Sequence, residues 1–176
     1  MKKHNKFLTL VLVVMMALAM VALAACADQQ ATNDNPEDNQ TAEGDTRIFT
    51  DLTGAEVELP TEIDSVIHLW PASTAMQVFL GESESITGTL TAVQNGWGWL
   101  TAACPSLLEV TGFTGEATAE ELLALEPDVV ITSSADTAES LRAAGVPCVC
   151  MLGDQESVPA LEEFCVKMAE LIGGDA

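Results

Sequence analysis

Residues 120–132 have the sequence EELLALEPDVVIT, and the change of pattern within this stretch decides the fold class. The first seven residues favour a helix, and Pro127 must end it because proline restricts the residue before it to extended conformations. Residues 128–132 are a short, almost continuous apolar run, typical of a strand that is buried on both faces of a parallel sheet. A helix followed directly by such a strand indicates an α/β fold.

The same alternation continues on both sides of this stretch. Further apolar strands are predicted at 65–70, 85–90 and 146–151. Further helices are predicted at 71–80, 136–144 and 157–172, with Gly81 and Gly145 placed to end the first two. Upstream, residues 47–60 predict a small hairpin that turns at Thr53-Gly54.

Two details of the helices can also be predicted. Ser73 or Thr74 is expected to cap the helix at 71–80, and Ser157 is expected to cap the last helix. The side chains expected on the apolar side of that last helix are Leu161, Phe164, Cys165, Met168 and Ile172. We therefore predict a three-layer α/β/α lobe with a mostly parallel sheet of about four to five strands, preceded by a small β-hairpin.

The first 25 residues have the pattern of an export signal. A basic start with Lys2, Lys3 and Lys6 is followed by an apolar run over residues 7–25, which is long enough to be considered as a permanent membrane anchor instead. The run ends in Leu23-Ala24-Ala25-Cys26, which resembles the lipobox of bacterial lipoproteins. That resemblance implies lipidation of the Cys26 thiol and cleavage just before it. The expected location is the cell membrane, with the protein lipid-anchored and facing the periplasm or cell exterior.

The rest of the chain is strongly acidic. The six Lys and Arg residues face 27 Asp and Glu, and without the three lysines of residues 1–25 the charge is −24. Such a surface repels phosphate backbones, so nucleic-acid binding is close to excluded, and polyanionic substrates and unaided adhesion to an anionic bilayer are disfavoured. Residues 26–46 contain no aliphatic side chain larger than Ala, and we expect the lipidated Cys26 and a disordered acidic tether there.

The sequence offers little for a metal site or a cofactor. His68 is the only histidine beyond residues 1–25, so a structural histidine is favoured over a metal ligand, and neither a metal nor a cofactor is expected. Cys148 and Cys150 lie two residues apart in a predicted strand and point to one face, which does not suit a disulfide between them. With Cys104 and Cys165 they are interpreted as small buried thiols, the alternative being one disulfide.

Ligands of parallel sheets bind beyond the carboxyl ends of the strands. The residues at or after those ends that suit ligand contact are Trp70, Ser73, Trp97, Trp99, Thr132 and Ser133. We expect the three indoles to form a flat stacking surface for a large ligand, the alternative being that some of them cap the core.

Catalytic motifs are missing: the sequence has no nucleophile elbow, no phosphate-binding P-loop and no dinucleotide fingerprint. The protein is expected not to be an enzyme. The alternative is an exported α/β hydrolase that uses Asp51 or the Glu120-Glu121 pair.

Five stretches together resemble the substrate-binding lipoproteins of ABC importers for ferric siderophores, haem and cobalamin. They are residues 51–60, 65–81, 105–115, 120–131 and 141–147. Departures from the family pattern are Ala75 in place of a carboxylate and Ala117-Thr118 in place of an asparagine. The family has two α/β lobes joined by one long helix, and residues 171–176 look like the point where that helix would begin. Residues 47–176 are therefore expected to be the amino-terminal lobe, with the second lobe absent.

The resemblance implies a non-enzymatic receptor that captures a metal chelate and delivers it to an ABC permease and its ATPase. It also implies a surface carboxylate that docks on permease arginines, for which the candidates are Glu139 and Asp136. We favour Glu139, because Asp136 is expected to cap its helix; the alternative is that Glu139 contacts Arg142. A vestigial surface lobe without a ligand is the remaining alternative.

Overall fold

Five parallel strands form the central sheet of the computed structural model, which describes residues 45–115, 117–153 and 158–173. The strands are β3 (Val66–His68), β4 (Ile86–Leu90), β5 (Thr111–Phe113), β6 (Val129–Thr132) and β7 (Cys148–Cys150), in the order β5-β4-β3-β6-β7. The central strands β3 and β6 are buried along their whole length, as the apolar runs in the sequence predict.

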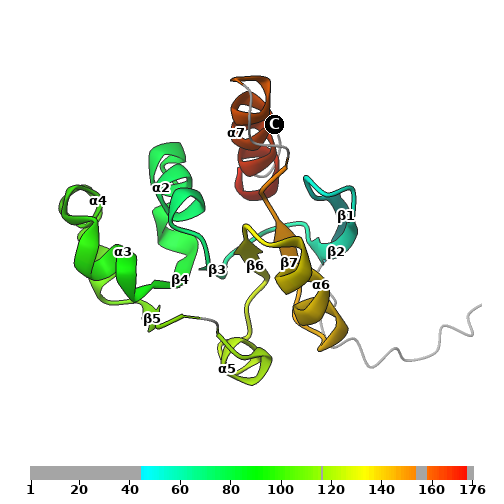
Figure 1. Ribbon diagram of the computed structural model, residues 1–176, viewed down its shortest axis with the longest axis horizontal. Coiled ribbons are helices and arrows are strands. Elements are labelled where there is room, and N and C mark those ends of the chain that lie inside the picture. The colour runs from blue at the N-terminus through cyan, green and yellow to red at the C-terminus, as the bar shows by residue number, and fades with distance from the viewer. Residues whose placement is uncertain (1–44, 116, 154–157, 174–176) are drawn as a thin grey trace, which may run out of the picture. The chain divides into compact units, whose positions relative to one another are not determined.

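Helices cover both faces of this sheet (Figure 1). They are α2 (Pro71–Leu80), α3 (Thr91–Gly96), α4 (Gly98–Ala103), α5 (Ala119–Leu123), α6 (Ala135–Ala143) and α7 (Val158–Ile172), with 3₁₀ turns at Ser83–Ser85 and Pro105–Leu108. One core joins α7 to Val66, Val129 and Val149, and a second core joins α5 and α6 to Ile67 and Val130. Since neighbouring strand residues point to opposite faces, these two cores lie on opposite sides of the sheet, and the predicted three-layer α/β/α lobe is confirmed.

The predicted hairpin is also present. Strands β1 (Thr46–Thr50) and β2 (Glu56–Pro60) pair antiparallel with Phe49 opposite Val57, and Gly54 takes a positive φ of 84° in the turn. Phe49, Val57 and Leu59 are buried in the same core as α7. The hairpin therefore packs against the last helix of the lobe.

Several local predictions are wrong. Neither Ser73 nor Thr74 caps α2: the cap position is Trp70, Pro71 starts the helix, and both hydroxyl residues are buried. No helix or strand is predicted for residues 91–113, and these form α3, α4, a 3₁₀ turn and the edge strand β5. Leu161 is 60 % exposed and does not join the buried side of α7. Gly81 does end α2, with a φ of 86°.

The predictions for Ser157 and for residues 1–44, including Cys26, lie outside the described residues. Among the residues that the structure does describe, no helix has the length and apolar character to cross a membrane.

Candidate functional site

The strand order places a switch point between β3 and β6. After β3 the chain crosses through α2 to β4 on one side, whereas after β6 it crosses through α6 to β7 on the other side. The two strands remain paired to their ends, since the Leu69 N–H donates to the carbonyl of Ile131 at 2.8 Å. Ligands of open α/β sheets bind at the carboxyl edge of such a switch point. Trp70 and Ser133 follow these two strand ends and are the natural candidates there.

Trp70 is half-buried at this edge. Its ring packs on Phe164 of α7, with 5.1 Å between ring centroids and a tilt of 56° between planes. Its backbone carbonyl accepts a hydrogen bond from the Thr74 N–H in the first turn of α2, and the Ser73 hydroxyl lies 2.8 Å from the same oxygen. The indole is thus held by both a helix start and a core contact, while part of its surface stays open to a ligand.

Ser73 does not face this edge. It is fully buried, and its hydroxyl lies 2.8 Å from Nδ1 of His68. On the other side of the imidazole, Nε2 lies 2.6 Å from Oε1 of Gln77. As Ser73 is turned into the domain, its expected contact with a ligand would require the polar network to open.

This network assigns the tautomer of His68. The amide nitrogen of Gln77 donates to the carbonyl of Glu82 at 2.8 Å, which turns Oε1 of Gln77 toward the imidazole. Because Oε1 can only accept, Nε2 of His68 carries the hydrogen and donates it. Burial lowers the pKa of His68 to about 4, with the hydrogen bond to Gln77 partly opposing the shift. The prediction of a structural histidine is confirmed.

At the end of β6, Thr132 faces the interior of the fold and the next residue, Ser133, faces outward. Thr132 is buried, and its hydroxyl accepts a hydrogen bond from the Ser134 N–H at 3.3 Å. Ser134 caps α6 by accepting from the Thr137 N–H at 3.2 Å. Ser133 is partly exposed, and within the described residues its hydroxyl has no hydrogen-bond partner. Ser133 therefore offers the free polar group at this edge.

The amino ends of α2 and α6 also meet the carboxyl edge, since each helix begins three residues after the last residue of its strand. The first N–H groups of a helix carry partial positive charge and attract anions. An aromatic ring, a free hydroxyl and two helix starts together suit a ligand with a flat apolar part and an anionic part.

Trp97 and Trp99 lie elsewhere in the lobe. The ring of Trp99 stacks on that of Phe79, with 5.8 Å between ring centroids and only 19° between planes. The ring centroids of Trp97 and Trp99 are 5.7 Å apart. Phe79 belongs to the last turn of α2, whereas Trp70 precedes its first turn. Trp97 packs on the core formed by α2, α3 and α4, and Trp70 packs on the α7 core. The described contacts therefore form two separate aromatic groups rather than the single surface expected.

The two candidate docking carboxylates are both exposed on α6. Asp136 does not cap the helix, because Ser134 does, so the reason for preferring Glu139 over Asp136 is wrong. Glu139 does not contact Arg142 either: that guanidinium lies 3.4 Å from Asp51 and donates to the carbonyl of Cys148 at 3.0 Å. Asp136, with Thr137 and Ser140, lines a shallow depression of about 310 Å³. Both carboxylates are available to a partner.

The acids considered for catalysis have structural roles. Asp51 is buried and accepts hydrogen bonds from Thr53, Ala55 and the N–H of Cys150. Burial opposes its ionisation, but these hydrogen bonds prevail and hold the pKa of Asp51 below its ordinary value. Glu121 forms a capping box with Thr118, whose backbone N–H lowers the pKa of Glu121. Neither carboxylate is placed as a general acid or base.

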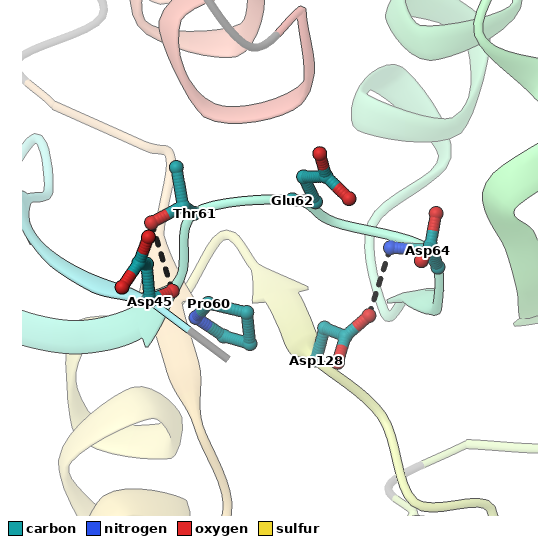
Figure 2. Close-up of a pocket in the computed structure, with 6 residues that line it drawn as sticks. All are labelled: Asp45, Pro60, Thr61, Glu62, Asp64 and Asp128. Atoms are coloured by element: carbon teal, nitrogen blue, oxygen red, sulfur yellow. Dashed lines mark hydrogen bonds between the residues drawn. The ribbon is translucent and has the colours of Figure 1, made fainter. Parts of the chain in front are cut away.

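A depression of about 480 Å³ lies at the opposite, amino edge of the sheet (Figure 2). Its lining residues are Asp45, Pro60, Thr61, Glu62, Asp64 and Asp128. The polar atoms there hold the fold together, since Asp128 accepts from the N–H groups of Asp64 and Ser65 at 2.8 and 2.9 Å. In the part of the chain that the structure describes, no group of three His, Cys, Asp or Glu side chains could hold a metal ion.

The four cysteines of the described lobe are free thiols. Cys148 and Cys150 point to one face of β7, as predicted, and both are buried against the core that contains α6. Burial raises the pKa of Cys148 to about 12 and also raises the pKa of Cys150. Such thiols act as small apolar side chains rather than nucleophiles.

No family model matches the sequence, and no curated protein matches it. Solved structures do match. A periplasmic solute-binding protein from Veillonella parvula aligns at a TM-score of 0.64 and 20 % identity, over 74 % of this chain and 42 % of its own length. The petrobactin-binding protein YclQ from Bacillus subtilis aligns at a TM-score of 0.60 and 13 % identity, over 74 % of this chain and 46 % of its own.

A molybdate-binding periplasmic protein of a Haemophilus influenzae ABC transporter aligns at a TM-score of 0.53 and 26 % identity, over 60 % of this chain and 34 % of its own. This chain thus shares the fold of periplasmic solute-binding proteins whose ligands differ widely. It spans less than half the length of each of these three neighbours.

Proposed function

We propose that this chain is the lipid-anchored solute-binding component of an ABC importer. It captures a metal chelate, such as a ferric siderophore, haem or cobalamin, and delivers it to a membrane permease with its ATPase. The observation that carries this proposal is the switch-point edge, where Trp70 and Ser133 follow adjacent strand ends in a lobe with the solute-binding fold.

The chemistry of this edge favours a chelate over a bare metal ion. A bare ion needs several His, Cys, Asp or Glu ligands in one place, and the described residues contain no such group. A chelate brings its own metal ligands and needs only a flat apolar surface and charge complementarity. Trp70 supplies the apolar surface, and the two helix starts suit anionic groups at the periphery of the chelate.

Residues 47–176 serve, in this proposal, as the amino-terminal lobe of such a receptor. This chain covers 42 % and 46 % of the lengths of two solved neighbours, and a ligand in a cleft contacts both walls. A second lobe that is encoded downstream, split off or supplied by a partner would complete the cleft. Sequencing the adjacent DNA tests this: an unrelated intact gene directly downstream contradicts a broken or split receptor.

The ligand proposal is tested by titrating ferric siderophores, haem, cobalamin and, as an oxyanion comparison, molybdate, while tryptophan fluorescence is followed. A Trp70→Phe variant distinguishes the fluorescence change of the indole at the edge from that of Trp97 and Trp99. We expect a chelate to quench the tryptophan fluorescence of the parent protein. In the variant, most of that quenching should be lost. Absence of quenching by every compound, also when a second lobe is supplied, contradicts the proposal.

Docking on the permease is assigned to α6. Asp136 and Glu139 are exposed, lie three residues apart on one helix and form no salt bridge with any residue that the structure describes, so both suit bidentate pairing with arginine. In a two-lobe receptor, the pair Asp136→Asn and Glu139→Gln should leave ligand affinity unchanged and weaken permease association. A fall in ligand affinity with intact association would contradict the assignment.

Lipid anchoring rests on the resemblance of Leu23-Ala24-Ala25-Cys26 to a lipobox. Metabolic labelling with a radioactive fatty acid should mark the parent protein and leave Cys26→Ser unlabelled. Cys165→Ser, which keeps Cys26, is the matched control and should remain labelled. Equal labelling of the parent and Cys26→Ser contradicts lipidation at this thiol.

A further inference from the structure

A second aromatic surface lies at the far end of α2 from the ligand edge. It consists of Phe79, Trp97 and Trp99, which we call the aromatic patch. Phe79 is 68 % exposed and Trp99 is 54 % exposed, although their rings stack on each other at 5.8 Å. Phe79 follows Trp70 by nine residues along the helix, a distance of about 13 Å. The aromatic patch is therefore not part of the site proposed for the solute.

The rings of the aromatic patch are held in place by the core on which Trp97 packs. Trp97 is half-buried and packs on a core of Val93, Leu100 and Leu107, while it also contacts Trp99 at 5.7 Å. A partner that binds such fixed rings immobilises few side-chain rotamers, which lowers the entropic cost of association. Exposed, fixed aromatic rings in one group mark a site of interaction.

The charge next to the aromatic patch is negative. Two exposed carboxylates, Glu82 and Glu84, come directly after the end of α2. The backbone of Glu82 folds back on the last turn of that helix, with its N–H donating to the carbonyl of Gln77 at 3.3 Å. Glu82 therefore lies beside the turn that carries Phe79, and Glu84 follows two residues later in the 3₁₀ turn at Ser83–Ser85.

The described residues offer no free positive charge to balance these acids. Arg47 donates to the carbonyls of Glu170 and Leu171, and Arg142 contacts Asp51 and the carbonyl of Cys148. Lys167 forms a salt bridge of 2.9 Å with Glu170. All three basic side chains of residues 45–115, 117–153 and 158–173 are thus used internally. A partner of this face must supply the cations itself.

We propose that the aromatic patch, together with Glu82 and Glu84, is a docking surface for a basic amphipathic segment of a partner protein. Apolar side chains of the segment cover Phe79 and Trp99. Its Lys or Arg side chains pair with the two carboxylates and can lie over the faces of the rings. A second copy of this chain fits poorly, because two surfaces of high negative charge repel each other.

The test uses the full chain and a dye-labelled helical peptide of about 18 residues made of Leu and Lys, with a Leu and Glu peptide as the charge control. Fluorescence anisotropy should show binding of the basic peptide alone. The double variant Phe79→Ser and Trp99→Ser should weaken it by about tenfold or more. Ile48→Ser, which removes a 63 % exposed apolar side chain from the hairpin, should leave it unchanged.

A second double variant tests the proposal even if the aromatic substitutions disturb the fold of α4. The pair Glu82→Gln and Glu84→Gln leaves the rings in place and should reduce both the affinity and its dependence on salt. Equal binding of the acidic peptide, or unchanged binding by both double variants, overturns the proposal. It is also overturned if the basic peptide binds neither the parent nor the aromatic variant, while another partner binds the parent more tightly than that variant. The other partners to be tested are phosphatidylcholine vesicles and a second copy of the chain.

Discussion

Nε2 of His68 lies 2.6 Å from Oε1 of Gln77, and this contact links the end of strand β3 to helix α2 in a fully buried position. The other ring nitrogen faces the hydroxyl of Ser73, which in turn reaches the carbonyl of Trp70. The backbone that presents the indole at the ligand edge is therefore tied to a neutral imidazole. Protonation of that imidazole in the folded state is disfavoured by burial.

The first prediction is a dependence of stability on pH that belongs to His68. The pKa falls from an ordinary value of 6.5 to about 4 on folding, so the unfolded chain binds the proton more tightly. The stabilisation is complete above pH 6.5 and is lost as the pH falls toward 4, by about 3 kcal/mol in total. Urea unfolding at several pH values measures it. A His68→Gln variant that keeps the same slope between pH 6.5 and 4 would contradict the assignment.

A second prediction concerns Asp51, which joins the hairpin turn to β7. Asp51→Ala leaves the buried N–H of Cys150 without its acceptor and removes the partner of Arg142, so the free energy of unfolding should fall by about 3 kcal/mol. Denaturant titration measures the loss, with the exposed Glu120→Ala as control. Because its pKa is lowered in the fold, Asp51 should contribute stability above about pH 4 that is lost in stronger acid. Equal free energies of unfolding for Asp51→Ala and Glu120→Ala would contradict the structural role of Asp51.

The third prediction tests the packing between β3, β4 and β5. A Cβ at Gly88 would lie 2.8 Å from a ring atom of Phe113 and 3.3 Å from two side-chain atoms of Ile67. Gly88→Ala should therefore destabilise the lobe by about 1–3 kcal/mol in a thermal melt. Gly96→Ala, where a Cβ meets nothing within 4 Å, is the matched control and should be neutral or stabilising. The reverse ranking of the two variants would show that β5 is not packed as described.

The fourth prediction concerns the thiols. Cys148 and Cys150 are buried and have raised pKa values, whereas Cys165 is only partly buried. Iodoacetamide at neutral pH should modify Cys165 well before the β7 pair, as peptide mass mapping would reveal. Addition of urea should make all of them reactive together. Rapid native labelling of Cys148 would contradict its burial, and a missing thiol after unfolding would indicate a disulfide.

Much of the fold was predictable because its main strands are buried on both faces and therefore form continuous apolar runs. The strand at 128–132 and the helix ending at Gly81 follow from local rules and are confirmed within a residue or two. Edge strand β5 was missed because only Phe113 of its three residues is buried, so no apolar run marks it. The helix cap at Trp70 was missed because Ser73 and Thr74 look like caps but are used by tertiary contacts instead.

The candidate site was predictable only where it follows directly from a strand end. Trp70, Thr132 and Ser133 lie at the switch point because parallel strands must end at a common edge. Whether a hydroxyl points outward, as for Ser133, or inward, as for Ser73, depends on packing that no local pattern encodes. The position of Trp97 and Trp99 depends on the path of residues 91–113, and neighbouring Phe79, although it lies within the stretch 65–81 that resembles the family, is not among the expected ligand residues.

The hairpin and α7, which lie far apart in the sequence, meet in one core. Arg47 holds the carbonyls of Glu170 and Leu171, and the turn at Asp51 holds the N–H of Cys150. These partners are separated by about a hundred residues or more, so the hairpin is fixed by long-range contacts, which form late because a long stretch of chain must first close into a loop. The apolar side chains of the hairpin, Phe49, Val57 and Leu59, therefore gain their full cover only once α7 is in place.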